Sequence, residues 1–160
     1  MISKDQRIPS GNLTSKGELG IQQFDPAELF ATGTHVLFAV PGAFTPTCSE
    51  QHLPGYVSHA QAFADAGVAS INCVAVNDAF VMQAWGKDLN VGDSVRLLSD
   101  GDGAYHQTLG LAKDTGSFGG IRAQRYAMII KEGVVTDLFV EDDKQFEVSK
   151  AEHVLQALKG

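Results

Sequence analysis

Apolar residues along the chain form two kinds of pattern, short unbroken runs and helical repeats, and the two kinds alternate. The segment from His35 to Val40 is almost entirely apolar and ends at Pro41-Gly42, which is typical of a strand buried on both faces of a sheet. After Cys48 the apolar residues recur at helical spacing, which predicts an amphipathic helix that ends near Gly67. Cys48 is therefore expected in the first turn of a helix that follows a buried strand.

Local start and stop signals place the remaining elements. The pairs Asp25-Pro26 and Asn77-Asp78 are helix-start signals, and Glu132-Gly133 is the signal of a two-residue hairpin. Ser149 followed by Glu152 has the spacing of a capping box at the start of the last helix. The further strands are predicted at 70–76, 95–99, 125–131 and 134–140, and the further helices at 25–30, about 79–89, after a turn at 100–103, and from 149 onward.

Two segments carry weaker patterns. Residues 1–20 are polar with short apolar islands, which predicts weak strands or turns at a sheet edge. Residues 114–120 are rich in glycine and are expected to form a loop. The order is therefore strand, helix, strand, helix, an inserted strand and helix, a hairpin and a final helix. It predicts an α/β domain of the thioredoxin-like fold, with a central mixed sheet, an inserted strand and helix, and an N-terminal extension.

Composition limits the classes of partner. The chain has 160 residues with 44% hydrophobic content, so we expect one domain over residues 1–160. A count of 12 Lys+Arg against 19 Asp+Glu gives a net charge of −7, which argues against nucleic acid and membrane surfaces. No apolar run typical of a secretory signal or a membrane span is present, so a cytoplasmic protein is expected.

The two cysteines, Cys48 and Cys73, are too few for a disulfide framework. Neither lies in a cluster with the spacing of a metal site, so no metal or bound cofactor is expected. The predicted position of Cys48 at a helix start points to chemistry, because a thiol attacks as thiolate and the free amides and dipole of a helix N-terminus stabilise an anion.

Two kinds of residue can assist such a thiolate. Thr45 stands three residues before Cys48, where the first cysteine of a Cys-x-x-Cys motif would stand, so its hydroxyl can contact whatever the sulfur contacts. A threonine there argues for a single attacking sulfur rather than disulfide exchange. Arg122 and Arg125 precede an apolar strand that can pack beside the first strand, and a guanidinium offers several rigid donors.

The segment Pro41-x-x-x-Thr45-x-x-Cys48 resembles the active-site motif of the peroxiredoxins. The longer match resembles the type-five, or type-II, subfamily, and it extends from about Phe30 to the C-terminus. It includes 40–49, His52 to Gly55, 70–81, Trp85-Gly86 and Arg125-Tyr126.

This resemblance implies a thiol peroxidase that reduces hydrogen peroxide and alkyl hydroperoxides. Cys48 would attack the peroxide and become a sulfenic acid, and Thr45 would orient the peroxide with nearby backbone amides. Pro41 would shield the sulfur and Arg125 would hold the thiolate, with Arg122 as a second arginine. The subfamily usually forms a dimer through the active-site region and the loop at 114–120, so a homodimer is expected.

The sequence departs from some type-five members because it has no cysteine after Cys73, and Cys73 is interpreted as a structural residue of the core. We therefore expect a one-cysteine enzyme whose sulfenic acid is reduced by an external thiol. Glutathione followed by glutaredoxin is the first expectation, and thioredoxin is the alternative.

Other interpretations stay open from the residues alone. A thioltransferase could use the same fold, although Thr45 argues against it. Alternatively, oxidation of Cys48 could switch a redox-sensing or chaperone-like binding protein. His52 lies one turn beyond Cys48 but is interpreted as a packing or capping residue. The aromatic residues near the motif are interpreted as core or interface residues, and they are Phe44, Phe80, Trp85 and Phe118.

Overall fold

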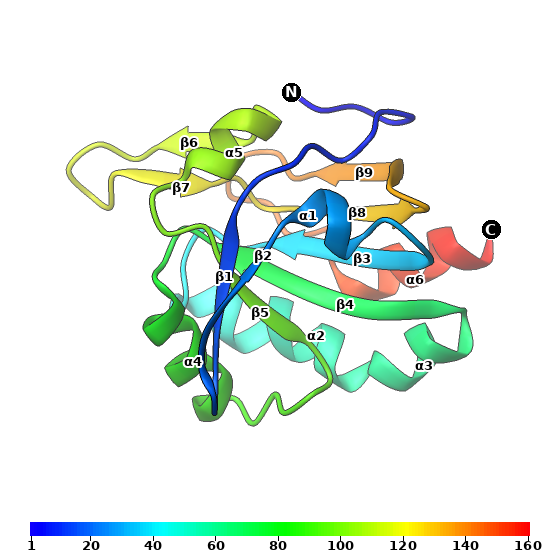
Figure 1. The fold of residues 1–160 in the computed structure, drawn as a ribbon, viewed down its shortest axis with the longest axis horizontal. Helices are drawn as coiled ribbons and strands as arrows, with labels where there is room; N and C mark the ends of the chain where they lie inside the picture. Colours follow the sequence, from blue (N-terminus) through cyan, green and yellow to red (C-terminus); the bar gives the residue numbers. More distant parts are fainter.

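The computed structural model describes residues 1–160, and a seven-stranded mixed sheet runs through its centre (Figure 1). The strand order is β2-β1-β5-β4-β3-β8-β9. Strands β3, β4 and β5 are parallel, whereas β8 and β9 add an antiparallel hairpin next to β3. The strands are β1 (Leu13–Gly17), β2 (Gly20–Phe24), β3 (Thr34–Ala39), β4 (Val68–Ala75), β5 (Arg96–Ser99), β8 (Tyr126–Lys131) and β9 (Val134–Val140).

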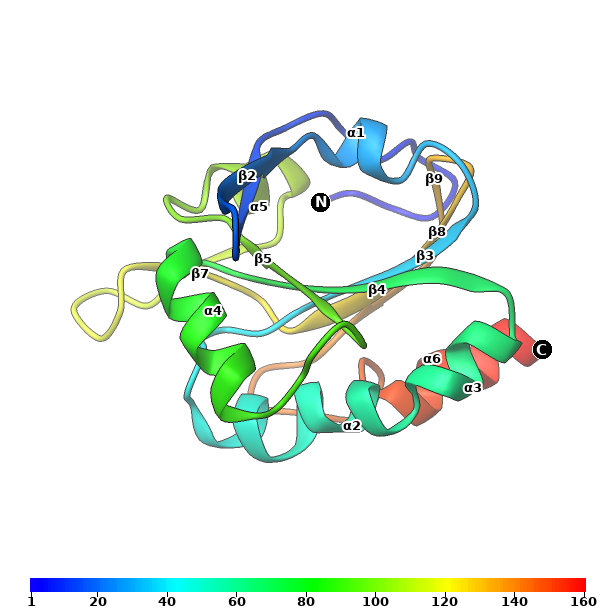
Figure 2. The ribbon, with the colours of Figure 1, turned by 60° about the horizontal axis from the view of Figure 1, so that its bottom comes forward.

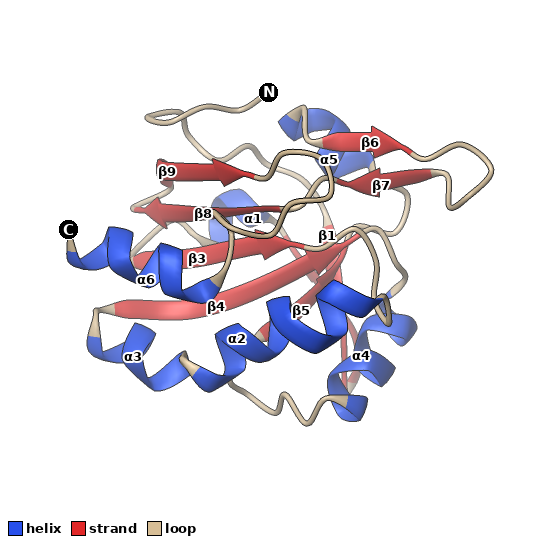
Figure 3. Cartoon of the chain, turned by 180° about the vertical axis from the view of Figure 1, so that it is seen from behind, coloured by secondary structure: helices blue, strands red, loops and turns tan.

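Helices cover both faces of this sheet. Figure 2 shows α1 and α5 with the N-terminal segment on one face, and Figure 3 shows the other helices in front of the opposite face. None of the helices is both long enough and apolar enough to cross a lipid bilayer. The predicted thioredoxin-like fold with a mixed sheet is confirmed. The α-helices are α1 (Pro26–Leu29), α2 (Leu53–Ser58), α3 (Ala60–Asp65), α4 (Ala79–Asp88), α5 (Ala104–Leu109) and α6 (Ala151–Lys159).

The predicted helix caps, hairpin turn and N-terminal edge strands are present in the structure. Asp25 accepts a hydrogen bond from the amide of Ala27, and Asp78 accepts one from Val81, so both are helix N-caps. Glu132 and the following glycine both have positive φ, of 51° and 78°, as a tight hairpin turn requires. The N-terminal residues form the β1–β2 hairpin at the sheet edge, and β1 joins β5 through the single pair Thr14–Ser99.

The helix predicted after Cys48 is broken into three parts. It begins with a π-helical turn, η1 (Cys48–His52), continues as α2, and breaks again before α3. The reason for the first break is Pro54, which has no N–H to donate and whose ring crowds the carbonyl one turn earlier. The amide of Leu53 donates instead to the carbonyl of Cys48, which is the wider bond of a π-turn. Helix α3 ends at Asp65, and Gly67 follows with φ +92°, so the helical segment ends near Gly67 as predicted.

The loop predicted at 114–120 is present from 115 to 120, but it connects a small second hairpin that was not predicted, β6 (Ala112–Asp114) and β7 (Ile121–Ala123), whose strands are too short to show an alternating pattern. One expectation needs correction. The capping box is wrong, because the hydroxyl and the amide of Ser149 both donate to Glu141, at 2.6 and 2.9 Å. Helix α6 therefore starts without a side-chain cap.

Glu141 also accepts a hydrogen bond from the amide of Glu147, so one carboxylate closes the connection between β9 and α6. Burial opposes ionisation, but these hydrogen bonds outweigh it and hold the pKa of Glu141 below its usual value. A carboxyl with a lowered pKa stabilises the fold above its unfolded pKa, and this contribution is lost as the pH falls through the folded pKa.

We predict that Glu141→Gln lowers the free energy of unfolding by about 1 kcal/mol at pH 7, because charge-assisted hydrogen bonds become neutral ones. The difference from the unmodified chain should shrink as the pH falls below the usual glutamate pKa. Urea unfolding at pH 7 and pH 3.5 measures both effects. Glu147→Gln is the matched control, and an equal loss there, or a loss independent of pH, would contradict the prediction.

Candidate active site

Cys48 stands where the buried strand β3 gives way to a helix. Ala39 and Val40 at the end of β3 are fully buried, and Cys48 is the first residue of η1 and also fully buried. The amide of Ser49 donates to the carbonyl of Thr45 at 2.9 Å, which closes the turn that carries the cysteine. The first amides of a helix have no partner within the helix, so this position favours an anion.

Arg125 is the residue that contacts the sulfur. Strand β8 runs beside β3 with Tyr126 opposite Ala39, which places the preceding residue, Arg125, at the end of β3. Its Nη2 donates to the Cys48 Sγ at 3.2 Å. Sulfur is thereby held against a fixed positive charge, which stabilises a thiolate by direct attraction.

Arg122 does not reach the sulfur. Its Nε donates to the carbonyl of Gly119 at 3.0 Å, and its Nη1 donates to the carbonyl of Val76 at 3.1 Å. It therefore ties the β6–β7 hairpin to the end of β4. Of the two arginines that the sequence left open, only Arg125 lies at Cys48.

His52 is the residue of this site that the sequence interpretation missed. Its Nδ1 lies 2.8 Å from Nη1 of Arg125, and its Nε2 lies 3.1 Å from the carbonyl of Ser149. A guanidinium only donates, so Nδ1 must accept and Nε2 must carry the proton. The one signal in the sequence was its position a single helical turn beyond Cys48.

The surroundings keep the His52 ring neutral. The ring is fully buried between Phe38, at 4.8 Å, and Phe146, at 5.0 Å between centroids. Burial, together with the charge of Arg125, lowers the pKa of His52 to about 3. His52 thus remains an acceptor for Arg125 across the physiological pH range.

Thr45 and Pro41 belong to the loop between β3 and η1. The Thr45 hydroxyl donates to the carbonyl of Gly42 at 2.6 Å, which leaves its lone pairs free to accept from another donor. Phe44 has a left-handed backbone with φ +65°, and the amide of Ala43 donates to the Asn77 side chain at 2.9 Å. These features fix the loop, and with it Thr45, one turn before Cys48.

The second cysteine, Cys73, lies in β4 opposite Phe38 and is fully buried in the apolar layer that includes Cys48. Burial raises the pKa of its thiol well above the usual value, and the nearby Cys48 raises it further. Cys73 is a free thiol, and its setting is that of a core residue, as the sequence predicted.

The four aromatic residues near the motif have different positions. Trp85 is fully buried and donates from Nε1 to the Ser49 hydroxyl at 2.9 Å. Phe44, Phe80 and Phe118 are 53%, 62% and 89% exposed. They belong to the β3–η1 loop, the start of α4 and the β6–β7 loop, which lie at one end of the molecule (Figures 1 and 2).

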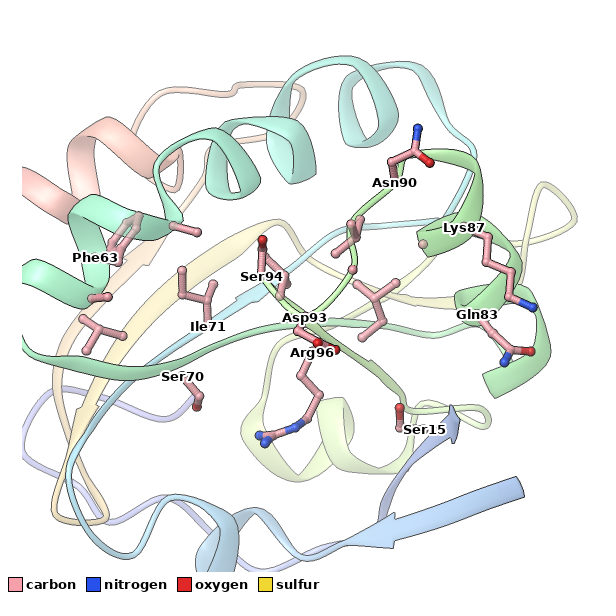
Figure 4. Close-up of a pocket in the computed structure, with 18 of the residues that line it drawn as sticks. Ser15, Phe63, Ser70, Ile71, Gln83, Lys87, Asn90, Asp93, Ser94 and Arg96 are labelled. Carbon is pink, nitrogen blue, oxygen red and sulfur yellow. The ribbon is translucent and has the colours of Figure 1, made fainter. Parts of the chain in front are cut away.

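Two cavities differ in their relation to Cys48. The larger one, about 890 Å³, lies between α3, α4 and β5, and Figure 4 shows Phe63, Ile71 and Lys87 around it. It contains no residue of the Cys48 site. A cavity of about 570 Å³ is lined by Pro41, Thr47 and Arg125, so it lies beside the guanidinium that contacts the sulfur, although Cys48 itself does not line it.

Known proteins share both the sequence and the fold. The Redoxin family matches residues 3–155. Peroxiredoxin-2C of Oryza sativa subsp. japonica is 44% identical over 98% of this chain and 98% of its own length. Peroxiredoxin-2E, chloroplastic, of Arabidopsis thaliana is 43% identical over 98% of this chain and 69% of its own length. The crystal structure of reduced Prx3 of Vibrio vulnificus in complex with hydrogen peroxide has a TM-score of 0.96 and 52% identity, covering 99% of both chains. The chain therefore belongs to the peroxiredoxin family, as the motif around Cys48 predicted.

Proposed function

We propose that this peroxiredoxin reduces hydrogen peroxide and alkyl hydroperoxides with Cys48 as the attacking thiolate. The observation that carries the proposal is the 3.2 Å contact between Nη2 of Arg125 and Sγ of Cys48. A fixed guanidinium at the sulfur supports the ionised form, which is the nucleophile. The Vibrio vulnificus relative was crystallised in complex with hydrogen peroxide, which supports the same substrate here.

The reaction follows from the groups around the sulfur. The Cys48 thiolate attacks one peroxide oxygen, an S–O bond forms and the O–O bond breaks. Sulfur is oxidised to sulfenic acid, and the departing oxygen takes a proton and leaves as water or an alcohol. Thr45 accepts from the peroxide O–H, because its own proton already points to Gly42. Arg125 and the free amides at the start of η1 stabilise the charge that shifts onto the oxygens, and Pro41 shields the sulfur from bulk water.

The sulfenic acid is reduced by a thiol from outside the chain. The second cysteine, Cys73, is fully buried, and burial keeps it protonated. A one-cysteine cycle therefore fits the residues present, with glutathione and glutaredoxin as the first reductant and thioredoxin as the alternative. A redox-sensing or chaperone-like binding protein is the rival function, and it would undergo oxidation of Cys48 without turnover.

Replacement of Cys48 is the direct test. Cys48→Ser should lower peroxide consumption by roughly three orders of magnitude or more, because a serine hydroxyl is not ionised at neutral pH. Turnover is measured with glutathione plus glutaredoxin and, separately, with thioredoxin plus its reductase. Cys73→Ala is the matched control and should keep turnover. Unchanged peroxide consumption by Cys48→Ser would contradict the proposal, and stoichiometric oxidation with every reductant would favour the rival.

His52 is proposed as a positioning residue that holds Arg125 toward the sulfur. His52→Phe keeps a ring between Phe38 and Phe146 but removes the acceptor, and it should slow the peroxide step about tenfold, the effect of losing one charge-assisted hydrogen bond. Stopped-flow fluorescence can follow this step, because the single tryptophan, Trp85, donates a hydrogen bond to the hydroxyl of Ser49, the residue after Cys48.

The conservative variant separates positioning from packing. In His52→Asn the amide oxygen lies near the place of Nδ1, so it should recover part of the lost rate although it fills less space. Thermal unfolding is measured for both variants. If the asparagine variant is slower than the phenylalanine variant, His52 acts through packing and the positioning role is wrong.

A homodimer is proposed through the end of the molecule that carries Phe44, Phe80 and Phe118. Three exposed aromatic side chains at one end support an association surface, since monomeric proteins rarely expose such groups together. Phe118→Glu should shift the protein toward the monomer in sedimentation velocity. Leu19→Glu, at a 95% exposed residue of the β1–β2 turn, is the control and should leave the association unchanged. A dimer that persists in Phe118→Glu would place the interface elsewhere.

A further inference from the structure

The larger cavity, of about 890 Å³, lies where the central sheet has an open edge. Strand β5 pairs with β4 only from Asn72 to Ala75, whereas β4 already begins at Val68. Residues 68–71 of β4 therefore have a partner strand only on the side of β3, and all four line the cavity. The volume falls within the range of small-molecule sites in proteins, which is about 300 to 1,000 Å³.

The charge of this cavity is opposite to that of the protein as a whole. The chain carries a net charge of −7. The cavity, in contrast, is lined by three cations, Lys16, Lys87 and Arg96, and by one anion, Asp93. A concave surface lined mainly by one sign of charge concentrates ions of the other sign. The cavity is therefore suited to a small anion.

Arg96 is the cation that the fold holds in place. Its Nη1 donates to Oδ1 of Asn72 at 2.9 Å, and its guanidinium carbon lies 5.4 Å from the centre of the Phe24 ring. Asn72 is fully buried, and its Nδ2 donates to the carbonyl of Val36 at 3.1 Å and to the hydroxyl of Ser70 at 3.0 Å. A guanidinium oriented in this way loses little entropy when a ligand binds.

The remaining donors of Arg96 have no partner in the chain. No carboxylate forms an ion pair with Arg96, and neither Nε nor Nη2 makes a hydrogen bond. Every fully buried polar side-chain atom of the protein has a partner, so these two nitrogens reach solvent. Burial lowers the pKa of the half-buried Arg96, and an anion beside it would oppose this effect. Nε and Nη2 form a fork that fits the two oxygens of a carboxylate.

An apolar part of the same cavity lies across the open sheet edge from Arg96. Figure 4 shows Ser70 and Arg96 on one side of β4, and Phe63 and Ile71 on the other, as the alternation of side chains along a strand requires. Leu97, which follows Arg96 in β5, also lines the cavity. Because no strand pairs with residues 68–71 on this side, the polar and apolar parts form one continuous cavity.

We propose that this cavity is a binding site for an organic monocarboxylate with a short apolar chain. The carboxylate pairs with Nε and Nη2 of Arg96, and the chain passes the open edge of β4 and packs against Ile71 and Phe63. One fixed fork favours a single negative charge, and Asp93 in the lining opposes the second charge of a phosphate monoester. The site is separate from the peroxidase centre, because none of the residues around Cys48 lines it.

The first test compares three probes on the unmodified protein. Hexanoate carries both the charge and the chain, acetate carries the charge alone, and 1-hexanol carries the chain alone. Isothermal titration calorimetry at pH 7 should show hexanoate binding at least tenfold more tightly than either of the others, because the ion pair and the buried methylene groups both contribute. Hexyl phosphate, with two negative charges, should bind more weakly than hexanoate.

The position of the bound probe is measured separately. In the ¹⁵N-labelled protein, hexanoate should shift the backbone amide NMR signals of residues 68–71 and 94–97. The chain has a second guanidinium in a cavity, Arg125, where a carboxylate could also bind. Shifts confined to residues 41–48 and 124–126 would place the probe at Arg125 and overturn the proposal.

Variants of Arg96 test the fork. Arg96→Gln should weaken hexanoate binding about tenfold, the effect of losing one charge-assisted pair, and Arg96→Lys should lose less because it keeps the charge without the fork. Arg7→Gln is the matched control, because it removes an exposed guanidinium outside the cavity, and it should leave the affinity unchanged. The amide spectrum of each variant shows whether it is folded, and the probe series on the unmodified protein does not depend on any variant.

Three further results would contradict the proposal. If 1-hexanol binds as tightly as hexanoate, the cavity takes apolar molecules and Arg96 does not recognise a carboxylate. If hexyl phosphate binds more tightly than hexanoate, the ligand class is wrong. If Arg96→Gln and Arg7→Gln weaken hexanoate equally, the anion is attracted by the general charge of the protein and not by the fork of Arg96.

Discussion

The hydrogen bond from Arg125 to the Cys48 sulfur is the interaction on which the rest of the site depends. The two residues are separated by 77 positions in the sequence, so only the tertiary fold can bring them together. The antiparallel pairing of β8 with β3, with Tyr126 opposite Ala39, sets their distance. A slip of one residue would turn the side chains of β8 to the other face of the sheet. The buried apolar residues on both faces of these strands make such a slip unfavourable.

A chain of hydrogen bonds extends this contact into the fold. The Glu141 carboxylate accepts a hydrogen bond from the Ser149 hydroxyl, and the carbonyl of Ser149 accepts one from Nε2 of His52. Nδ1 of His52 in turn accepts one from Arg125. Each member fixes the orientation of the next, because a guanidinium only donates and a neutral imidazole has one donor and one acceptor. The connection between β9 and α6 thereby determines where the guanidinium points, although none of its residues bonds to the sulfur.

Features encoded by neighbouring residues could be predicted from the sequence. The cap residues Asp25 and Asp78, the turn at Glu132 and the buried strand that ends before Pro41 all depend on local chemistry, and all are confirmed. The position of Arg125 next to an apolar strand was enough to bring it to Cys48, once that strand was paired with β3.

Features that depend on distant partners could not be predicted. The spacing of Ser149 and Glu152 is that of a capping box, but Glu141 competes for the Ser149 hydroxyl from the end of another strand. The hydrogen bond between His52 and Arg125 joins the end of η1 to the residue before β8, and no residue spacing in the sequence links these two segments. Pro54 is a local helix breaker that the sequence contains, but the π-turn that it leaves at Cys48 follows from how the flanking backbone re-forms its hydrogen bonds.

The two cysteines differ in the charged groups around the sulfur and not in exposure. Cys48 and Cys73 are both fully buried and belong to the same apolar layer. Cys48 has a helix N-terminus and a guanidinium at its sulfur, whereas burial raises the pKa of Cys73. The charge of Cys48 raises the pKa of Cys73 further, so a thiolate at the first position opposes a thiolate at the second. The fold thus places a guanidinium and a helix start at one sulfur only, and burial favours the protonated thiol at the other.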